Sequence, residues 1–270
     1  MIKIENVNKR FYSGTDNEVF ALNNINLSVA DGEFITIIGT NGSGKSSLLN
    51  AIAGSFYPDT GRITIDNKDF TYVPEYKRAK YISRVFQNPF IGTAADMTIG
   101  ENLHLAFLRG SKRTLLLKLN KERKDFYITK LKELEMNLED RIDSPIGTLS
   151  GGQRQAITLL MAVMQKPKVL LLDEHTAALD PKSAMQVLRL TKMFISKEKL
   201  TTIMVTHSMN QALELGNRTI MMNKGQIIED INLKEKNSLT SEDLNNKFNQ
   251  IRKIEKLTSR MIEDFRNQYV

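Results

Sequence analysis

The run F-I-T-I-I at residues 34–38 leads directly into G-T-N-G-S-G-K-S at residues 39–46, and this junction decides the fold. The second stretch fits the phosphate-loop pattern, which lies after a strand and opens a helix. Glycines let backbone N–H groups turn toward phosphates, the helix N-terminus adds positive potential, Lys45 reaches the outer phosphates and the Ser46 hydroxyl can bind Mg²⁺. A glycine-rich turn of purely structural purpose is the alternative, and the strand context and the Lys-Ser pair argue against it. The residues expected to contact nucleotide here are Gly39, Asn41, Gly42, Ser43, Gly44, Lys45, Ser46 and Ser47.

Two further apolar runs, at residues 169–172 and 202–205, also end abruptly. Continuous runs of this length are typical of strands covered on both faces, as in a parallel sheet flanked by helices. Helical stretches at residues 45–53 and 181–195 alternate with these runs, so the sequence predicts a layered α/β core. Ligands of such sheets bind beyond the carboxyl ends of the strands. The residues delivered to those ends are Gly39, Asp173 and His207.

Two acidic residues, Asp173 and Glu174, directly follow the run at residues 169–172. A nucleotide site needs one carboxylate beside the metal and a second beside the attacking water. We therefore expect Asp173 to bind Mg²⁺ directly or through water, and Glu174 to act as the general base. The alternative is a strand end that simply meets solvent, and the nearby phosphate loop argues against it.

The stretch L-S-G-G-Q at residues 149–153 precedes a helical run at residues 154–164. Ser150 and Gln153 have the spacing of a capping box, so a well-capped helix is one reading. Paired glycines in a first helical turn cost about 1 kcal/mol each relative to alanine, which a cap alone does not explain. Close approach of the backbone to an anion explains them better. The residues expected to contact phosphate here are Ser150, Gly151, Gly152 and Gln153.

These stretches together resemble the motif set of ABC ATPases, in the same order, over about residues 1–230. The resemblance implies a P-loop NTPase fold with a RecA-like α/β core, an N-terminal antiparallel β-subdomain and an inserted helical subdomain. It also implies that the signature at residues 149–153 covers ATP held by the phosphate loop of a second subunit. Two ATP molecules would then lie between two subunits.

The resemblance assigns further roles. Gln87 matches the glutamine that senses Mg²⁺ and water and links the core to the helical insertion, and an ordinary polar loop residue is the alternative. Asp180 matches the loop that crosses to the partner subunit, although Asp before Pro is also a helix cap. His207 matches the switch histidine that contacts the γ-phosphate and orients Glu174. Phe11 matches the aromatic residue that stacks on adenine, and a core aromatic is the alternative reading.

Two details of the match stay open. Tyr12 is the fallback for the adenine contact. His175 stands where the family commonly has proline, and it is either a neutral turn residue or a contact to the nucleotide or the partner. Stretches with a histidine at this position resemble those of ATPase subunits that serve binding-protein-dependent importers. Aromatic amino acids or related small solutes are the candidate cargo. The remaining histidine, His104, has no metal-ligand companions and receives no role.

Composition fits a globular protein without disulfides. The 38 Lys and Arg residues exceed the 31 acidic residues by a formal charge of +7, and there is no cysteine. No secretory signal and no run of about 20 apolar residues is visible, so we expect a soluble or peripheral protein at the cytoplasmic face of the membrane. Nine basic residues lie between residues 109 and 132. They form either a solvated helix face or a surface for anionic lipid.

We expect three regions along the chain. The α/β core comprises residues 1–87 and 167–231, and residues 88–166 form the helical subdomain, with helical patterns at 115–119 and 126–136. Residues 232–270 form a C-terminal helical tail. Its apolar residues recur three or four apart from Leu244 to Phe265, and Thr240 with Asp243 offers a capping box. Packing of this helix on the chain's own core is favoured over a docking surface.

The sequence therefore predicts an ATP- and Mg²⁺-dependent ATPase subunit of an ABC transporter, with import of amino acids or similar small solutes as the favoured role. The expected partners are a second copy of the ATPase, transmembrane permease subunits and a solute-binding lipoprotein, without nucleic acid. Soluble ABC-type ATPases of cluster assembly or DNA repair are the alternative class. ABC ATPases of efflux or lipoprotein release are the third.

Overall fold

A six-stranded sheet lies at the centre of the computed structural model, which describes residues 1–110 and 119–250. The strand order is β10-β9-β3-β8-β7-β6, and every strand is parallel to its neighbours except the antiparallel β10. The three strands expected from the apolar runs are confirmed. The strands are β3 (Phe34–Gly39), β6 (Ile82–Val85), β7 (Val169–Asp173), β8 (Thr201–Val205), β9 (Arg218–Asn223) and β10 (Gln226–Ile231).

The central strands read as continuous apolar runs because both faces of the sheet are covered. On β7, Leu170 and Leu172 belong to one buried cluster, which the helices of residues 99–198 complete. Val169 and Leu171, at alternate positions, belong to a second cluster on the opposite face. Side chains alternate along a strand, so burial of both faces favours apolar residues at successive positions.

A four-stranded antiparallel sheet, ordered β2-β1-β4-β5, packs with helix α1 (Lys45–Ala53) against that second face. Its strands are β1 (Ile2–Phe11), β2 (Val19–Val29), β4 (Thr60–Ile65) and β5 (Lys68–Asp69). Helix α1 has the bounds expected from the sequence. It ends at Gly54, whose φ of 86° is the left-handed cap that glycine adopts without strain. Beyond β5 lies the short helix α2 (Glu75–Arg78).

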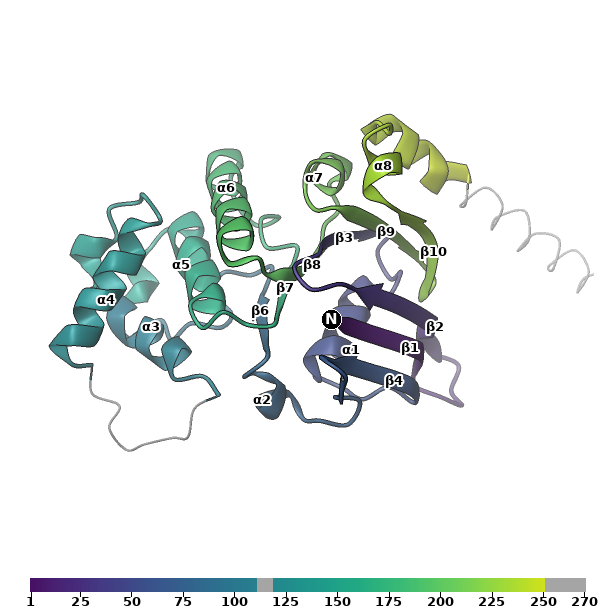
Figure 1. The fold of residues 1–270 in the computed structure, drawn as a ribbon, viewed down its shortest axis with the longest axis horizontal. Helices are drawn as coiled ribbons and strands as arrows, with labels where there is room; N and C mark the ends of the chain where they lie inside the picture. Colours follow the sequence, from purple (N-terminus) through teal and green to yellow (C-terminus); the bar gives the residue numbers. More distant parts are fainter. Residues whose placement is uncertain (111–118, 251–270) are drawn as a thin grey trace, which may run out of the picture.

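The helices between β6 and β7 form the left part of Figure 1. They are α3 (Ile99–Phe107), α4 (Lys121–Lys132) and α5 (Gly151–Val163), and α6 (Pro181–Glu198) lies beside α5. The helix expected at residues 126–136 begins five residues earlier and ends four residues earlier. Its end is followed by Glu135 and Asn137, whose φ values of 54° and 52° are incompatible with a continuing helix. Residues 115–118 of the other expected helical pattern lie outside the described residues.

The C-terminal part of the chain packs beside the phosphate-loop strand. Helix α7 (Met209–Glu214) precedes β9, the short helix α8 (Leu233–Lys236) follows β10, and residues 241–250 are helical. The capping box of Thr240 and Asp243 is confirmed, at 2.7 Å and 3.2 Å. Leu244 and Phe248 are buried in a cluster with Ile38 of β3, which confirms packing on the chain's own core for this segment. The rest of the expected tail helix, from residue 251, lies outside the described residues.

Within residues 1–110 and 119–250, no helix combines the length and the apolar character that crossing a bilayer requires. The boundaries of the three regions expected from the sequence remain predictions.

Candidate functional site

The phosphate loop joins the carboxyl end of β3 to the first turn of α1, as the sequence predicts. Gly44 has a φ of 99°, and a Cβ there would come within 2.5 Å of the Ala21 carbonyl oxygen. A Cβ at Gly39 would come within 2.4 Å of the Met222 carbonyl oxygen. Close approach to two neighbouring segments therefore requires glycine at both positions.

Lys45 lies under this loop and is 5% exposed. Its Nζ donates hydrogen bonds to the carbonyl oxygens of Gly39 and Thr40, both at 2.9 Å. Burial lowers the pKa of Lys45, while the negative charges of Glu174 and Asp173 oppose that shift. The loop, the ammonium group and the two carboxylates therefore belong to one electrostatic unit.

Asp173, at the end of β7, faces two different groups. Its Oδ1 accepts a hydrogen bond from the Ser46 Oγ at 3.4 Å, and its Oδ2 forms an ion pair with Arg84 Nη2 at 2.6 Å. Arg84 Nη1 donates to Asn50 Oδ1 at 2.5 Å. Sequence reasoning predicted Ser46 and Asp173 but missed Arg84 and Asn50. The available signal was a charged residue inside the otherwise buried strand I-S-R-V of β6.

Glu174 and His207 come together at the same edge of the sheet. The distance between His207 Nε2 and Glu174 Oε1 is 2.6 Å, and the Glu174 side chain is only 13% exposed. Glu174 has a φ of 49°, and its N–H donates to the Val205 carbonyl oxygen at 3.0 Å. The left-handed turn right after β7 and the bond to β8 fix the direction of the carboxylate.

Gln211 is a further residue that sequence reasoning missed. Its Oε1 accepts a hydrogen bond from Thr206 Oγ1 at 2.8 Å, and its Nε2 lies 3.4 Å from Thr176 Oγ1. These two threonines belong to the segments that carry His207 and Glu174. The helix α7 thereby helps to hold both segments in place.

His175 is fully buried, which excludes direct contact of its imidazole with nucleotide or partner. Its Nε2 lies 3.0 Å from Thr191 Oγ1 of α6, and burial lowers the pKa of His175 to about 4. This burial agrees with the expectation from the sequence that His175 is a neutral turn residue. Its carbonyl oxygen accepts a hydrogen bond from Gln155 Nε2 of α5 at 2.8 Å, and the same nitrogen donates to the Phe86 carbonyl oxygen at 3.0 Å.

Gln87 is exposed and shares a cavity with Asp173. The cavity has a volume of about 490 Å³, and Gly151 and Ala178 also line it. A separate cavity of about 400 Å³ contains Gly39, Thr40, Asn41 and His207, together with Asn245, Phe248 and Asn249 of the C-terminal helix. The structure thus brings Gln87, Asp173, Glu174 and His207 to the edge of the sheet where the phosphate loop lies.

The signature residues open α5. Ser150 and Gln153 form the expected capping box, with hydrogen bonds of 3.3 Å and 3.2 Å. A Cβ at Gly152 would lie 2.5 Å from Ser183 Oγ of α6, whereas Gly151 has no atom nearer than 3.7 Å. Close packing against α6 therefore requires glycine at position 152, a reason that sequence reasoning did not identify, whereas a Cβ at Gly151 would make ordinary van der Waals contacts.

Asp180 caps α6 through the N–H groups of Lys182 and Ser183, at 3.1 Å and 3.0 Å.

Phe11 lies edge-on to Phe56, with ring centroids 5.2 Å apart. Tyr12 is 72% exposed. The adenine contact therefore stays a prediction for Phe11, with Tyr12 as the more accessible ring.

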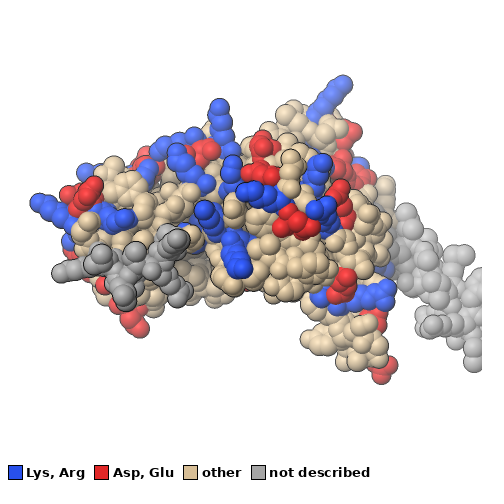
Figure 2. Space-filling model, turned by 60° about the horizontal axis from the view of Figure 1, so that its bottom comes forward, with Lys and Arg blue, Asp and Glu red and all other residues tan. Residues whose placement is uncertain are grey.

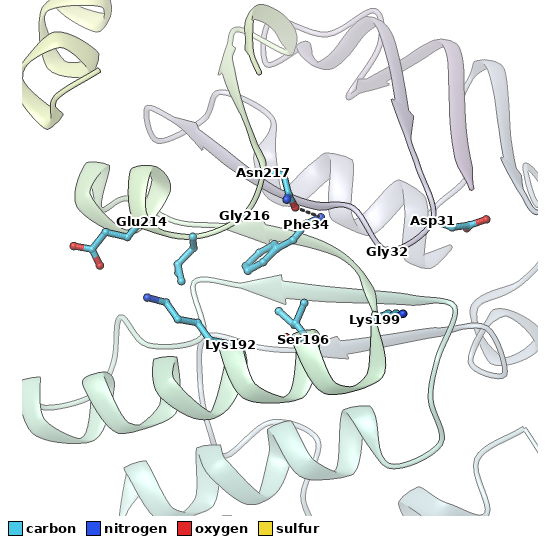
Figure 3. Close-up of a pocket in the computed structure, with 11 residues that line it drawn as sticks. Asp31, Gly32, Phe34, Lys192, Ser196, Lys199, Glu214, Gly216 and Asn217 are labelled. Atoms are coloured by element: carbon cyan, nitrogen blue, oxygen red, sulfur yellow. Dashed lines mark hydrogen bonds between the residues drawn. The ribbon is translucent and has the colours of Figure 1, made fainter. Parts of the chain in front are cut away.

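Figure 3 shows a different cavity, at the opposite edge of the sheet. It has a volume of about 580 Å³ and is lined by residues that include Asp31, Phe34, Lys192 and Glu214. Phe34 starts β3, whereas the phosphate loop follows its end. The predicted site residues are absent from the described lining, so this cavity is distinct from the nucleotide site.

Several of the described basic residues of the helical region have partners within the chain. Lys124 and Lys130 form ion pairs with Asp143 and Glu133 at 2.6 Å and 2.8 Å. The Arg123 guanidinium lies 4.8 Å from the Phe107 ring centroid. Figure 2 shows acidic and basic side chains interspersed over the face that it displays. Among the described residues, this pattern favours the solvated helix face over the lipid surface.

Comparison with known proteins identifies relatives. The family described as "ABC transporter" matches residues 22–177. The tyrosine transport ATP-binding protein of Clostridioides difficile is 43% identical over 250 residues, covering 92% of this chain and 98% of that protein. The spermidine/putrescine import ATP-binding protein PotA of Haemophilus influenzae is 36% identical over 85% of this chain, which spans 57% of that protein's length.

A solved structure is also similar. It is the dimeric structure of a post-hydrolysis state of an ATP-binding cassette bound to ADP and Pi. It has a TM-score of 0.74 and 31% sequence identity, and the match covers 86% of this chain and 99% of that chain. The expected class of fold, a P-loop NTPase cassette, is therefore confirmed.

Proposed function

Because the chain belongs to the ABC transporter family as an ATP-binding, ATP-hydrolysing subunit, we propose that it powers import of amino acids or similar small solutes through separate membrane subunits. The observation that carries the catalytic part is the pair of Glu174 and His207, 2.6 Å apart beside the phosphate loop. The relative named as a tyrosine transport ATP-binding protein, matched over nearly its whole length, supports the cargo class.

In the proposed mechanism, the N–H groups of the phosphate loop and Lys45 hold the β- and γ-phosphates. Glu174 accepts the proton of the attacking water, and His207 holds the carboxylate in place while its ring faces the γ-phosphate. A general base of this kind typically contributes about 10² to 10⁴ in rate. Phe11 or Tyr12 stacks on adenine.

The residues at this edge suit Mg²⁺. A hydroxyl and a carboxylate converge within 3.4 Å at Ser46 and Asp173, and small, hard cations prefer such oxygen ligands. Ser46, Asp173 and Gln87 would hold the ion, which supplies charge neutralisation at the phosphates. The remaining ligands of such an ion are water and phosphate oxygens.

Two copies of the chain form the working unit in this proposal. ATP bound to the phosphate loop of one copy is covered by the signature residues of the other copy, Ser150, Gly151, Gly152 and Gln153. Asp180 belongs to the loop that crosses from one copy to the other. ATP must bind the closed pair more tightly than the open pair, since equal affinity would shift nothing. Permease subunits contact the surface near Gln87, a solute-binding lipoprotein delivers the cargo, and the complex lies at the cytoplasmic face of the membrane.

The substitution Glu174→Gln tests the catalytic part. It keeps the size of the side chain but removes the base, so we expect ATP binding to persist while the turnover number falls by about 10² to 10⁴. Steady-state hydrolysis and nucleotide binding are measured side by side. Turnover at the wild-type rate would remove Glu174 as the base.

Reconstitution tests the transport part. The neighbouring genes are searched for a permease and a binding protein, the chain is co-expressed with them, and uptake of radiolabelled tyrosine, tryptophan and methionine into vesicles is measured. ATP-driven uptake that Glu174→Gln abolishes is the expected result. Hydrolysis without association with any permease would favour a soluble ABC-type ATPase, and outward transport would favour efflux.

A further inference from the structure

Arg84 is a charged residue of β6, a strand whose other residues are all buried. In the parallel pairing of β6 with β7, Arg84 is opposite Leu171, two residues before Asp173. Side chains two apart on a strand share a face. Arg84 and Asp173 therefore point to the face that α1 covers, where Asn50 and Ser46 lie.

The guanidinium group contacts three parts of the fold. Nη2 pairs with Asp173 Oδ2 at 2.6 Å, Nη1 donates to Asn50 Oδ1 at 2.5 Å, and the guanidinium carbon lies 4.7 Å from the Phe86 ring centroid. The side chains of Arg84 and Asp173 are each only 13% exposed. The planar fork of arginine fits this arrangement, because one group reaches a carboxylate and an amide oxygen at once.

These contacts make the two oxygens of Asp173 unequal. Oδ2 is held by Arg84, whereas Oδ1 faces the Ser46 hydroxyl at 3.4 Å. A carboxylate held in this way offers one oxygen to a cation. Mg²⁺ requires near-ideal octahedral geometry at short distances, while Ca²⁺ accepts bidentate carboxylates and more ligands.

We propose that Arg84 is a positioning residue that holds Asp173 in a one-oxygen orientation, and so sets the affinity and the Mg²⁺ preference of the nucleotide-bound cation site. This inference rests on the proposed function, because it assumes that Asp173 binds the cation. Groups that orient a metal ligand in this way typically contribute about 10- to 100-fold in metal affinity. Arg84 acts through Asp173 and does not itself contact the substrate.

The test uses two substitutions and a matched control in the full chain. Arg84→Met removes the charge and both hydrogen bonds, and Arg84→Lys keeps the charge but loses the fork. Arg62→Met removes an exposed arginine that pairs with Asp69 in the antiparallel sheet. Binding of Mn²⁺ in the presence of β,γ-imido-ATP is followed by electron paramagnetic resonance, with Mg²⁺ and Ca²⁺ as competitors. Nucleotide binding in EDTA and thermal unfolding are measured on the same samples.

We expect the Mn²⁺ dissociation constant to rise about 10- to 100-fold in Arg84→Met and by a smaller factor in Arg84→Lys. In both variants Ca²⁺ should displace Mn²⁺ more effectively, relative to Mg²⁺, than it does in the wild type. The Arg62→Met variant should bind the metal ions as the wild type does. Nucleotide binding in EDTA should be the same in all the proteins. Wild-type affinity and selectivity in folded Arg84→Lys or Arg84→Met would overturn the proposal. If the wild type itself bound no Mn²⁺ with the analogue, the proposed function would fail instead.

Discussion

At the residue scale, the buried side chains of Arg78 and Lys236 differ in how their charged groups are hydrogen-bonded. Arg78 is fully buried, and its guanidinium donates to the carbonyl oxygens of Val73, Ala51, Ile52 and Thr71, at 2.7 to 3.1 Å. Two of these four hydrogen bonds, to Ala51 and Ile52, satisfy carbonyl groups that α1 leaves unpaired at its end. Lys236 is also buried, and among the described residues its ammonium group donates to the carbonyl oxygens of Leu215 and Gly216. The ammonium group of Lys236 therefore makes fewer hydrogen bonds than the guanidinium group of Arg78.

This difference gives a pH dependence of stability. Burial lowers the pKa of Lys236 to about 8, below the value of about 10.4 in an unfolded chain. Between these values the unfolded state binds more protons than the folded state, so this residue makes stability rise with pH. Relative to Lys236→Met, the wild type should gain about 2 kcal/mol in free energy of unfolding between pH 7.5 and pH 9.5. Urea unfolding of both proteins at the two pH values measures this gain, and an equal response in both would contradict it.

At the element scale, the contact between α5 and α6 depends on one glycine. A Cβ on Gly152 would lie 2.6 Å from Ser183 Cβ, which no side-chain rotation relieves, whereas a Cβ on Gly151 would come no nearer than 3.7 Å to another residue. We expect Gly152→Ala to lower the free energy of unfolding by about 1 to 3 kcal/mol through overpacking.

The matched substitution Gly151→Ala should leave stability unchanged or raise it, since alanine favours a helix. Adding Ser183→Gly to Gly152→Ala should recover part of the loss. Chemical unfolding of the three variants measures these differences. Equal destabilisation by both glycine substitutions would show that helix packing is not the cause.

The elements also show what the sequence could predict. The bounds of α1 and the positions of β3, β7 and β8 were predictable, because each run ends at glycine, polar or charged residues that act locally. Helix α4 ended earlier than expected, because residues in the left-handed region stop it although the apolar pattern continues. Lys45, Ser46, Asp173 and Glu174 were predictable because their motifs are contiguous.

The contacts of Arg84, Asn50 and Gln155 were not predictable from the sequence. They depend on which strands are neighbours and on the register of β6 against β7, which no local pattern specifies. The same reason applies to the packing role of Gly152, because it depends on where α6 crosses α5.

At the scale of the whole molecule, the signature residues and the phosphate loop line different cavities of one chain. A site shared between two copies predicts complementation. A chain with Lys45→Met keeps its signature, and a chain with Ser150→Arg keeps its phosphate loop. Each variant alone should fail to dimerise with ATP, whereas a mixture should form dimers in which one site is complete. Because only mixed dimers form and each has one complete site instead of two, about half of the wild-type number of complete sites is expected when all chains pair.

Light scattering with ATP, before and after mixing, measures this outcome. A third sample mixes Lys45→Met with wild-type chain and serves as the positive control. No gain on mixing the two variants, with a gain in the control, would place both parts of the site in one chain.

The amide of Gln155 has a consequence for how two such sites work together. It contacts the carbonyl groups next to Gln87 and next to Glu174, and it lies little more than one turn after the Ser150 cap of α5. The beginning of α5 is expected to meet ATP held by the other copy, whereas Gln155 contacts the catalytic loops of its own copy. Occupancy of one site should therefore reach the base of the second through a single rigid helix. Hydrolysis is then expected to be cooperative in ATP, with a Hill coefficient above 1 that falls toward 1 when Gln155 is replaced by methionine.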